Sequence, residues 1–386
     1  MGMNIEIIGT GFKNKGAHLM LIAIVQELAR WNADARLAIR SKPEENWDGK
    51  GLGLYQKPEV SESYLGSLIL GMRFGNRTRD HYQMILDPEI DVVLDASGFK
   101  YSDLFGHRSI LDRAKKIAKW KRSGKRIVLL PQAFGPLEAP RVREAAHLLA
   151  DHADLIFARD RDSFDQLVEL VGSRDSIRIS PDFTNLVVGQ APDYSKDMNN
   201  RACLIPNTQM VARTSDAIGR SYVPFIAGCA RFLNDAGFNP FILLHEVEKD
   251  GALAQQVQDM SGVELEIIEE ANPLYIKGII GNCRLVVGSR YHALISALSQ
   301  GVPAVATSWS HKYECLYEEY HSPELLISDL YFHKNALPVL LRLSEPDYYD
   351  KTVQTLKRSA QSNIEKTKRM WSDVREVILP EIHPSS

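Results

Sequence analysis

The chain has 386 residues, more than a single hydrophobic core usually organises, so two domains are expected. Its apolar fraction of 44% and charged fraction of 25% are typical of a soluble globular protein, and its formal net charge of −3 argues against binding nucleic acid through a basic surface. Four dispersed cysteines without a C-x-x-C pair favour a reduced, cytoplasmic protein over a disulfide framework or a zinc site.

Short strand-like runs alternate with amphipathic helical runs from the start of the chain to about residue 188. The strand-like runs are NIEIIG, DVVLDASG, RIVLLPQ and LIFARD. This alternation predicts a parallel sheet covered by helices, which forms an N-terminal lobe over residues 1–190. The chain enters its first strand without a basic and apolar leader, so no signal peptide is expected.

A glycine-rich loop at residues 9–18 joins the first strand to the first helix. Its glycines lack the G-x-G-x-x-G spacing and no Walker lysine-serine pair follows, so neither nucleotide fingerprint is matched. The loop amides either face an anion or a sugar, or they only form a tight turn. Ligands of such sheets bind beyond the carboxyl ends of the strands, which makes Asn14 and Lys15 candidate acceptor contacts.

The stretch from Tyr64 to Arg79 is the longest apolar patch outside these elements. Its uncharged part of about nine residues is too short to span a bilayer, which takes about 20. The stretch is therefore either a core helix or loop, or a segment that touches a membrane surface beside Arg73, Arg77 and Arg79. The second alternative predicts a cytoplasmic protein with peripheral contact to the inner face of the cell membrane near residues 64–79.

Four polar residues follow or end later strands of the first lobe. Asp95 either accepts hydrogen bonds from a sugar hydroxyl or caps the next helix. Gln132 lies in a rigid proline-containing loop and is a candidate polar contact. Arg159 either points at an anionic ligand or is a solvated arginine beside a helix cap, and Asp182 is expected to bond backbone or ligand near the junction of the lobes.

The alternation stops at Gly189–Asn200, which is rich in Pro, Gly, Asp, Ser and Asn and is predicted to be a linker. It resumes over residues 201–345, which predicts a second lobe. The tail at residues 346–386 predicts one or two helices that pack back on the N-terminal lobe. The predicted fold class is α/β, with two Rossmann-like doubly wound lobes, an interdomain cleft and a C-terminal helix.

The run LVVGSRYH in the second lobe places a cation and a titratable ring where a buried strand turns into a helix. Ser289 is a suitable N-cap for that helix, which puts Arg290 in its first turn. A cation there opposes the helix dipole by a few tenths to about 1 kcal/mol. Unless a carboxylate neutralises Arg290, the position favours an anion shared with the helix amides, and His292 lies beside the same anion.

The next strand end, VATSWSHKYE, adds further polar groups to this edge of the sheet. Ser308 and Lys312 are the candidate anion contacts, with Ser310 and His311 between them. Cations from neighbouring loops indicate a multiply charged anionic ligand, so the second lobe is predicted to be the donor side.

Together these segments resemble the polysaccharide pyruvyl transferase family. The resemblance covers roughly residues 4 to 320 and rests on the following motifs, which occur in the family's order: GxxxxNKGA, LDASG, LPQAFGP, ARDRDS, PDFTNL and GSRYHALISALSQGVPAVATSWSHKYE. It implies a fold similar to two-lobed GT-B glycosyltransferases. It also implies transfer of pyruvate from phosphoenolpyruvate onto two sugar hydroxyls, which forms a ketal and releases phosphate.

The resemblance also implies roles for single residues. The family's Arg-x-His motif matches Arg290 and His292, which implies donor binding and acid/base catalysis, while Lys312 and Arg159 match its lysine and its Arg-Asp arginine. Two departures are visible: Gly16-Ala17 stands where many members have Gly-Asp, and Ala96-Ser97-Gly98 stands where many have Gly-Gly. Both fall in the predicted N-terminal lobe, so they bear on the acceptor more than on the donor.

The function expected from the sequence is therefore a pyruvyl transferase that acts on a cell-surface polysaccharide or its precursor, with phosphoenolpyruvate as co-substrate and no metal or other cofactor. His292 is the expected acid or base, because a histidine pKa lies near the working pH. Two alternatives are a nucleotide-sugar glycosyltransferase of the same architecture and a sugar-binding homologue without activity. The acceptor, its attachment to a lipid and the oligomeric state stay open.

Overall fold

The chain divides into two compact units in the computed structural model, which describes residues 2–31, 34–41 and 49–379. The first unit contains Met1–Lys13, Met20–Phe183 and Lys366–Ser386, and the second contains Asn14–Leu19 and Thr184–Glu365. The predicted class, two α/β units that each contain a parallel sheet, is confirmed. The first unit ends at Phe183 and not at the predicted residue 190.

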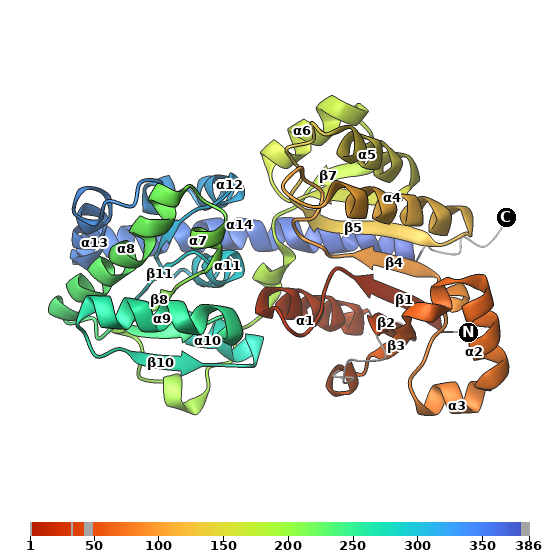
Figure 1. The fold of residues 1–386 in the computed structure, drawn as a ribbon, viewed down its shortest axis with the longest axis horizontal. Coiled ribbons are helices and arrows are strands. Elements are labelled where there is room, and N and C mark those ends of the chain that lie inside the picture. Colours follow the sequence, from red (N-terminus) through yellow and green to blue (C-terminus); the bar gives the residue numbers. More distant parts are fainter. Residues whose placement is uncertain (1, 32–33, 42–48, 380–386) are drawn as a thin grey trace. The chain divides into compact units, whose positions relative to one another are not determined.

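The first unit is built on a seven-stranded sheet in the order β3-β2-β1-β4-β5-β6-β7, in which every neighbouring pair is parallel. Its strands are β1 Met3–Ile8, β2 Ala35–Ser41, β3 Tyr55–Pro58, β4 Val92–Asp95, β5 Arg126–Gln132, β6 Leu155–Ala158 and β7 Ile177–Ile179. Its helices are α1 Lys15–Arg30, α2 Tyr64–Arg73, α3 Asn76–His81, α4 His107–Arg122, α5 Pro140–His152 and α6 Arg161–Val171 (Figure 1). The strand order reverses between β1 and β4, the place where doubly wound sheets bind ligands.

The second unit contains a six-stranded sheet in the order β10-β9-β8-β11-β12-β13, again with parallel neighbours. Its strands are β8 Ala202–Ile205, β9 Phe241–Leu244, β10 Glu266–Glu269, β11 Leu285–Gly288, β12 Ala304–Thr307 and β13 Leu326–Ile327. Its helices are α7 Gln209–Ala212, α8 Asp216–Asp235, α9 Val247–Ser261, α10 Pro273–Gly281, α11 Tyr291–Leu298, α12 Lys312–Glu319 and α13 Leu337–Ser344. Here the order reverses between β8 and β11.

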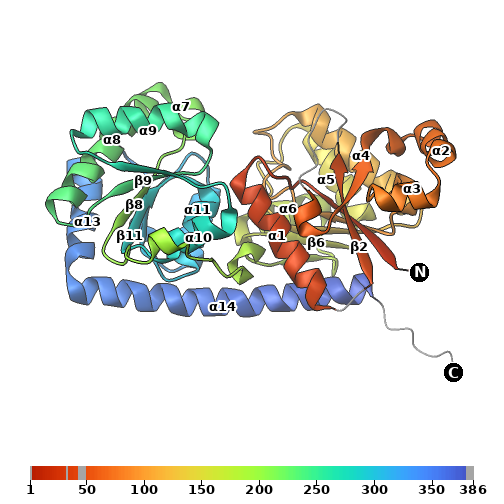
Figure 2. The same cartoon turned by 90° about the horizontal axis from the view of Figure 1, so that it is seen from below.

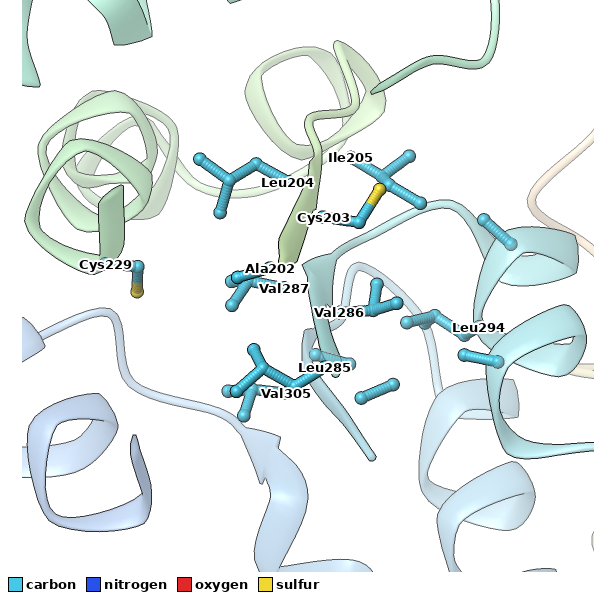
Figure 3. Close-up of a cluster of buried hydrophobic side chains, with 14 of the residues drawn as sticks. Ala202, Cys203, Leu204, Ile205, Cys229, Leu285, Val286, Val287, Leu294 and Val305 are labelled. Atoms are coloured by element: carbon cyan, nitrogen blue, oxygen red, sulfur yellow. The ribbon is translucent and has the colours of Figure 1, made fainter. Parts of the chain in front are cut away.

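The four central strands of the second unit are continuously apolar because they lie in its core. Every residue of β8, β9, β11 and β12 is buried, as expected for parallel strands covered by helices on both faces. Figure 3 shows side chains of β8, β11 and β12 together with Cys229 of α8 and Leu294 of α11. These strands cannot present side chains to a ligand from their middle, so the site must be built by the loops at their ends.

The predicted linker lies against helix α10 of the second unit. The Gln190 N–H donates to the Leu274 carbonyl (3.0 Å), and a Cβ on Gly189 would lie 2.7 Å from the Gly278 nitrogen. Real Cβ atoms do not come that close to backbone, so the close packing of the two segments depends on glycine at residue 189.

The C-terminal region forms one long helix, α14 (Pro346–Ile378), and not two. Its residues up to Glu365 belong to the second unit and those from Lys366 belong to the first (Figure 2). In the first unit, the Arg126 Nη1 donates to the Ile378 carbonyl (2.7 Å), and Arg178 pairs with Asp373 (2.6 Å).

Candidate active site at the carboxyl edge of the second sheet

The loops that follow β8 and β11 meet where the strand order of the second sheet reverses. Asn207, directly beyond β8, donates from Nδ2 to the carbonyl of Ser289 beyond β11 (2.7 Å). The Asn207 N–H donates to the Tyr222 hydroxyl (3.0 Å), whose pKa is raised by burial in the core. These bonds fix the two loops against each other, which gives a rigid frame to the residues that follow.

Arg290 lies in this frame and is held by two carboxylates. Its Nε donates to Asp250 Oδ2 (3.0 Å) and its Nη2 to Asp250 Oδ1 (2.6 Å), while its Nη1 lies 3.0 Å from Glu246 Oε1. Asp250 is on helix α9, Glu246 precedes that helix, and the arginine is only 7% exposed. A bidentate pair of this kind fixes the guanidinium plane as well as its charge.

This arrangement corrects the electrostatic argument from the sequence. Arg290 is the N-cap residue of α11 and not part of its first turn, and its charge is neutralised by Asp250 and Glu246. Its position therefore does not by itself require an external anion. Asp250 holds both Nε and Nη2 of Arg290, whereas Nη1 contacts only Glu246 among the described residues.

The predicted N-cap role of Ser289 is wrong, because no side-chain cap bond is made at this helix. The Ser289 hydroxyl is fully buried and lies 2.8 Å from the Tyr222 hydroxyl and 2.6 Å from Thr307 Oγ1. It therefore joins the ends of β11 and β12 to α8, and this geometry gives no support to its predicted contact with a donor.

His245 and Glu246 are functional candidates that the sequence reasoning missed. His245 follows β9 and is 5% exposed, and its Nδ1 has no hydrogen-bond partner among the described residues. Burial lowers the pKa of His245 well below its usual value, and the positive charges of Arg290, His292 and Lys15 lower it further. The ring is therefore neutral at physiological pH. The signal was available in the sequence, since a histidine and a glutamate directly follow the apolar residues of β9.

Glu246 connects several of these residues. Burial alone would raise its pKa, but Lys249, Arg290 and Asn14 together hold the pKa below the usual range, so the group is a carboxylate. The Asn14 Nδ2 donates to Glu246 Oε1 (2.5 Å), and Lys249 Nζ lies 2.7 Å from Oε2. An ionised Glu246 therefore sits between Arg290 and the first loop of the chain.

The second part of the first loop, from Asn14 onward, belongs to the second unit and not to the predicted N-terminal lobe. Residues 14–19 cluster with the second unit, where Lys15 Nζ donates to the Ala271 carbonyl (2.8 Å). A Cβ built on Gly16 would overlap the His292 ring, so only glycine allows this approach. The departure at Gly16-Ala17 thus lies beside the predicted acid/base, and its predicted place in the N-terminal lobe is wrong.

His292 is partly exposed in the first turn of α11, and its ring makes an edge contact with Tyr291 (5.7 Å between centroids). Lys312 reaches the same tyrosine: its Nζ lies 4.8 Å from the Tyr291 ring centroid, 4.5 Å from Trp309 and 5.5 Å from Tyr313. Aromatic faces attract a cation and hold it in place. The structure thus brings Arg290, His292 and Lys312 to neighbouring loops of one sheet edge.

Two serines complete this edge. Ser308 is partly exposed directly after β12, and the buried Ser310 Oγ makes no hydrogen bond with any residue that the structure describes. Buried polar atoms normally find a partner, so Ser310 Oγ and His245 Nδ1 are atoms at which a ligand could bond.

The carboxyl edge of the first sheet carries a different group of residues. The Asp95 carboxylate is fully buried; it accepts from the Tyr101 hydroxyl (2.6 Å) and the Ser97 hydroxyl (2.6 Å), and Arg113 lies 3.6 Å away. It does not cap the following helix, whose N-cap is Gly106. Gln132 donates to the Asp95 carbonyl (2.9 Å), while its buried Oε1 has no partner within the described chain.

Arg159 and Asp182 are placed together in the first unit. Both are buried, and Arg159 Nη1 lies 3.6 Å from Asp182 Oδ2. The two residues therefore form an ion pair, whereas the bond predicted for Asp182 was to backbone or ligand. Arg159 lies in the other unit from Arg290 and Lys312, so its predicted donor contact remains a prediction.

Chemically, the edge of the second sheet can hold an anion and move a proton. It combines two partly exposed histidines, His292 and His311, with the neutral buried His245 and three cationic side chains. In the described ranges, no three His, Cys, Asp or Glu side chains are grouped to hold a metal ion.

Comparisons with known proteins agree with the fold and the motifs. A family model for polysaccharide pyruvyl transferase matches residues 14–311. Solved structures with the same fold include Anabaena Alr3699/HepE in complex with UDP and glucose, with TM-score 0.60 and 12% identity over 98% of this chain and 100% of that one. They also include a glycosyltransferase from Rickettsia africae (TM-score 0.59, 9% identity, 98% and 99% covered) and the UDP-GlcNAc 2-epimerase of Neisseria meningitidis bound to UDP-GlcNAc (0.56, 10%, 95% and 100%). At such identities these structures show the GT-B-like fold alone.

Proposed function

The chain belongs to the polysaccharide pyruvyl transferase family, and from this membership we propose that it transfers the pyruvyl group of phosphoenolpyruvate to two hydroxyls of one sugar. The sugar is part of a polysaccharide or of its precursor, and the products are a cyclic pyruvate ketal and inorganic phosphate. The observation that carries the proposal is the convergence of Arg290, His292, His245 and the first loop at the switch point of the second sheet.

The donor chemistry matches this group of residues. Phosphoenolpyruvate carries a carboxylate and a phosphate, so it needs several cations or amide donors. Arg290 offers Nη1, with its plane fixed by Asp250, and Lys312 and Lys15 supply further positive charge. The ionised Glu246 beside Arg290 would repel the donor unless it turns toward Lys249, which already contacts its other oxygen.

The reaction needs one proton delivered to carbon and two removed from oxygen. His292 donates a proton to the methylene carbon while the first sugar hydroxyl attacks C2, and the proton of that hydroxyl then returns to His292. The bond between C2 and the phosphate oxygen breaks next, and the second hydroxyl attacks C2 and passes its proton to the departing phosphate. His292 suits the first step because it is partly exposed and belongs to the Arg-x-His motif, whereas His245 is buried and neutral.

The acceptor is assigned to polar groups of the first unit. The Gln132 Oε1 is a buried acceptor without a partner in the described residues, and it lies beside the fixed Asp95. A sugar hydroxyl is a suitable donor for such an oxygen.

The test is a phosphate-release assay with phosphoenolpyruvate and a panel of nucleotide-activated and lipid-linked sugars. We expect acceptor-dependent release and a product heavier by one pyruvyl group in mass spectrometry. Absence of both with every acceptor would favour the non-catalytic alternative.

The second candidate, a nucleotide-sugar glycosyltransferase, is favoured by the structural likeness to the Anabaena protein that binds UDP and glucose. Thermal shift separates the two, because a ligand that binds the folded state raises the melting temperature. A shift with phosphoenolpyruvate supports the proposal, whereas a shift with UDP- or GDP-sugars alone supports the glycosyltransferase.

A further inference from the structure

Helix α2 of the first unit exposes an apolar ridge that has no use in the proposed reaction. The ridge is made by Leu65, Leu68, Ile69 and Met72, which are 64%, 45%, 47% and 72% exposed. Their spacing of three, four and seven residues places them on one face of the helix. The opposite face packs inward through the buried Ser67 and the partly buried Leu70 and Phe74. Helix α2 therefore has two packing faces. The inward face is covered by the rest of the first unit, and the outward ridge is not covered by any residue that the structure describes.

The exposure is concentrated in this segment. Of the 15 large hydrophobic residues that are exposed in the described chain, five lie within residues 60–72, because Val60 (54%) adjoins the ridge. Helices α2 and α3 lie at an edge of the first unit in both views (Figures 1 and 2). Contiguous exposed apolar side chains of this kind mark a contact surface, whereas single ones do not.

The charge around the ridge is positive. Arg73 and Arg77 are exposed, and neither has a carboxylate within 4 Å among the residues that the structure describes. The acidic groups nearby are each paired with a cation, namely Glu59 with Arg40, Glu62 with Lys57 and Lys116, Asp80 with Arg36, and Glu89 with Arg79. Among the described residues, the unpaired charge at this surface is therefore that of two arginines next to an apolar stripe.

We propose that the ridge of α2 docks on an anionic lipid bilayer, with Leu65, Leu68, Ile69 and Met72 inserted among the lipids and Arg73 and Arg77 at the phosphate headgroups. Interfacial helices combine an apolar face with flanking arginines in this way. Long arginine side chains keep their charge at the interface while their stems cover apolar surface. Within the described parts of the chain, no helix combines the length and apolar character needed to cross a bilayer.

A lipid surface fits the ridge better than a second protein copy does. A specific protein interface buries about 800 Å² on each partner and takes about 20 to 30 residues a side. The ridge offers four apolar side chains with Val60 beside them, which is too few to fill an interface of that size. A bilayer needs no shape complementarity, so a single helical stripe with adjacent cations is sufficient.

The experiment is co-sedimentation of the full chain with sucrose-loaded vesicles of phosphatidylcholine alone and of phosphatidylcholine with about one-third phosphatidylglycerol. We expect binding to the anionic vesicles that weakens with added salt. Leu68→Ser/Ile69→Ser should weaken it about tenfold or more through lost apolar burial, and Arg73→Gln/Arg77→Gln by a similar factor through lost charge attraction. These side chains are exposed, so both variants should fold.

The matched control is Met260→Ser/Leu341→Ser, which removes two apolar side chains that are each 49% exposed in the second unit. It should leave vesicle binding unchanged. The proposal is overturned if the wild type ignores both vesicles, or if the control weakens binding as much as Leu68→Ser/Ile69→Ser. It is also overturned if light scattering shows a dimer that Leu68→Ser/Ile69→Ser dissociates, because a second copy then covers the ridge. None of these outcomes depends on the proposed reaction.

Discussion

The two sheets of the molecule have the same parallel architecture and opposite chemistry at their carboxyl edges. In the first unit the central group is a carboxylate, Asp95, held by hydroxyl donors and one distant arginine. In the second unit the central group is a guanidinium, Arg290, held by two carboxylates and surrounded by two histidines. The shared topology supplies a place for a ligand, and the residues at that place decide which ligand it is.

The two charged groups, the Asp95 carboxylate and the Arg290 guanidinium, are held in place in different ways. Asp95 accepts from neighbours on its own loop, so its position depends on local sequence. Arg290 is fixed by Asp250, which lies 40 residues away on another helix. A ligand-binding charge that is fixed over such a distance depends on the whole unit being folded, and the following experiments test that distinction.

The largest expected effect is on catalysis. His292→Ala should lower phosphate release from phosphoenolpyruvate by about 10²- to 10⁴-fold, the usual loss for a general acid or base. The comparison variant is His107→Ala, which removes a histidine of similar exposure from the first unit. Equal activity of the His292 variant and the wild type would exclude His292 as the proton donor.

The next largest effect is on stability. Asp250→Ala leaves the buried Arg290 without its main partner and should lower the free energy of unfolding by about 3 to 5 kcal/mol. The double variant Asp250→Ala/Arg290→Met should regain part of this loss, since no uncompensated charge is then buried. Urea unfolding of both variants measures the coupling, and a double variant that is less stable than the single one would contradict this description of the pair.

A smaller effect concerns pH. Folding depresses the pKa of His245, so below about pH 6.5 the unfolded chain binds a proton that the folded chain does not. The contribution of His245 to the free energy of unfolding should therefore fall by up to about 1.4 kcal/mol for each pH unit as the pH drops below about 6.5. Above that pH this contribution should not change. His245→Gln should flatten this part of the profile, and an unchanged slope in that variant would mean that other groups cause it.

The smallest effect is expected at Ser289. Ser289→Ala removes a buried hydroxyl between Tyr222 and Thr307 and should cost about 1 to 2 kcal/mol of stability. Its affinity for phosphoenolpyruvate should equal that of the wild type, because the hydroxyl faces the core. A clear loss of affinity in calorimetry would restore Ser289 as a donor ligand.

The sequence predicted the fold well because parallel strands are continuous apolar runs, and these alternate visibly with helices. It misplaced the unit boundary, because the irregular residues after Phe183 pack on α10 through the close approach of Gly189 and Gly278, which no local pattern reveals. A composition rich in glycine and proline shows that a segment is irregular, but not which unit it packs on.

The candidate site was predicted only in part, because its residues come from segments that are far apart in the sequence. The cluster around Arg290 and His292 follows from the strand-end rule, but the partners Asp250 and Glu246 come from another helix and its preceding loop. Likewise, residues 14–19 follow the first strand of one unit and pack on the other. Pairings over 40 or more residues depend on how the strands are ordered in the sheet, and one sequence read alone does not give that order.

The central claim is that the donor binds at the second sheet edge and not at the first. Calorimetric titration of phosphoenolpyruvate tests it with two lysine-to-methionine variants that remove one charge from each edge, Lys312→Met and Lys100→Met. Lys100 is partly exposed beyond β4, and burial followed by the charge of Arg113 lowers its pKa. We expect Lys312→Met to weaken binding about tenfold or more through the loss of a charge-assisted contact, and Lys100→Met to leave the affinity unchanged. Weaker binding in Lys100→Met with normal binding in Lys312→Met would contradict the account.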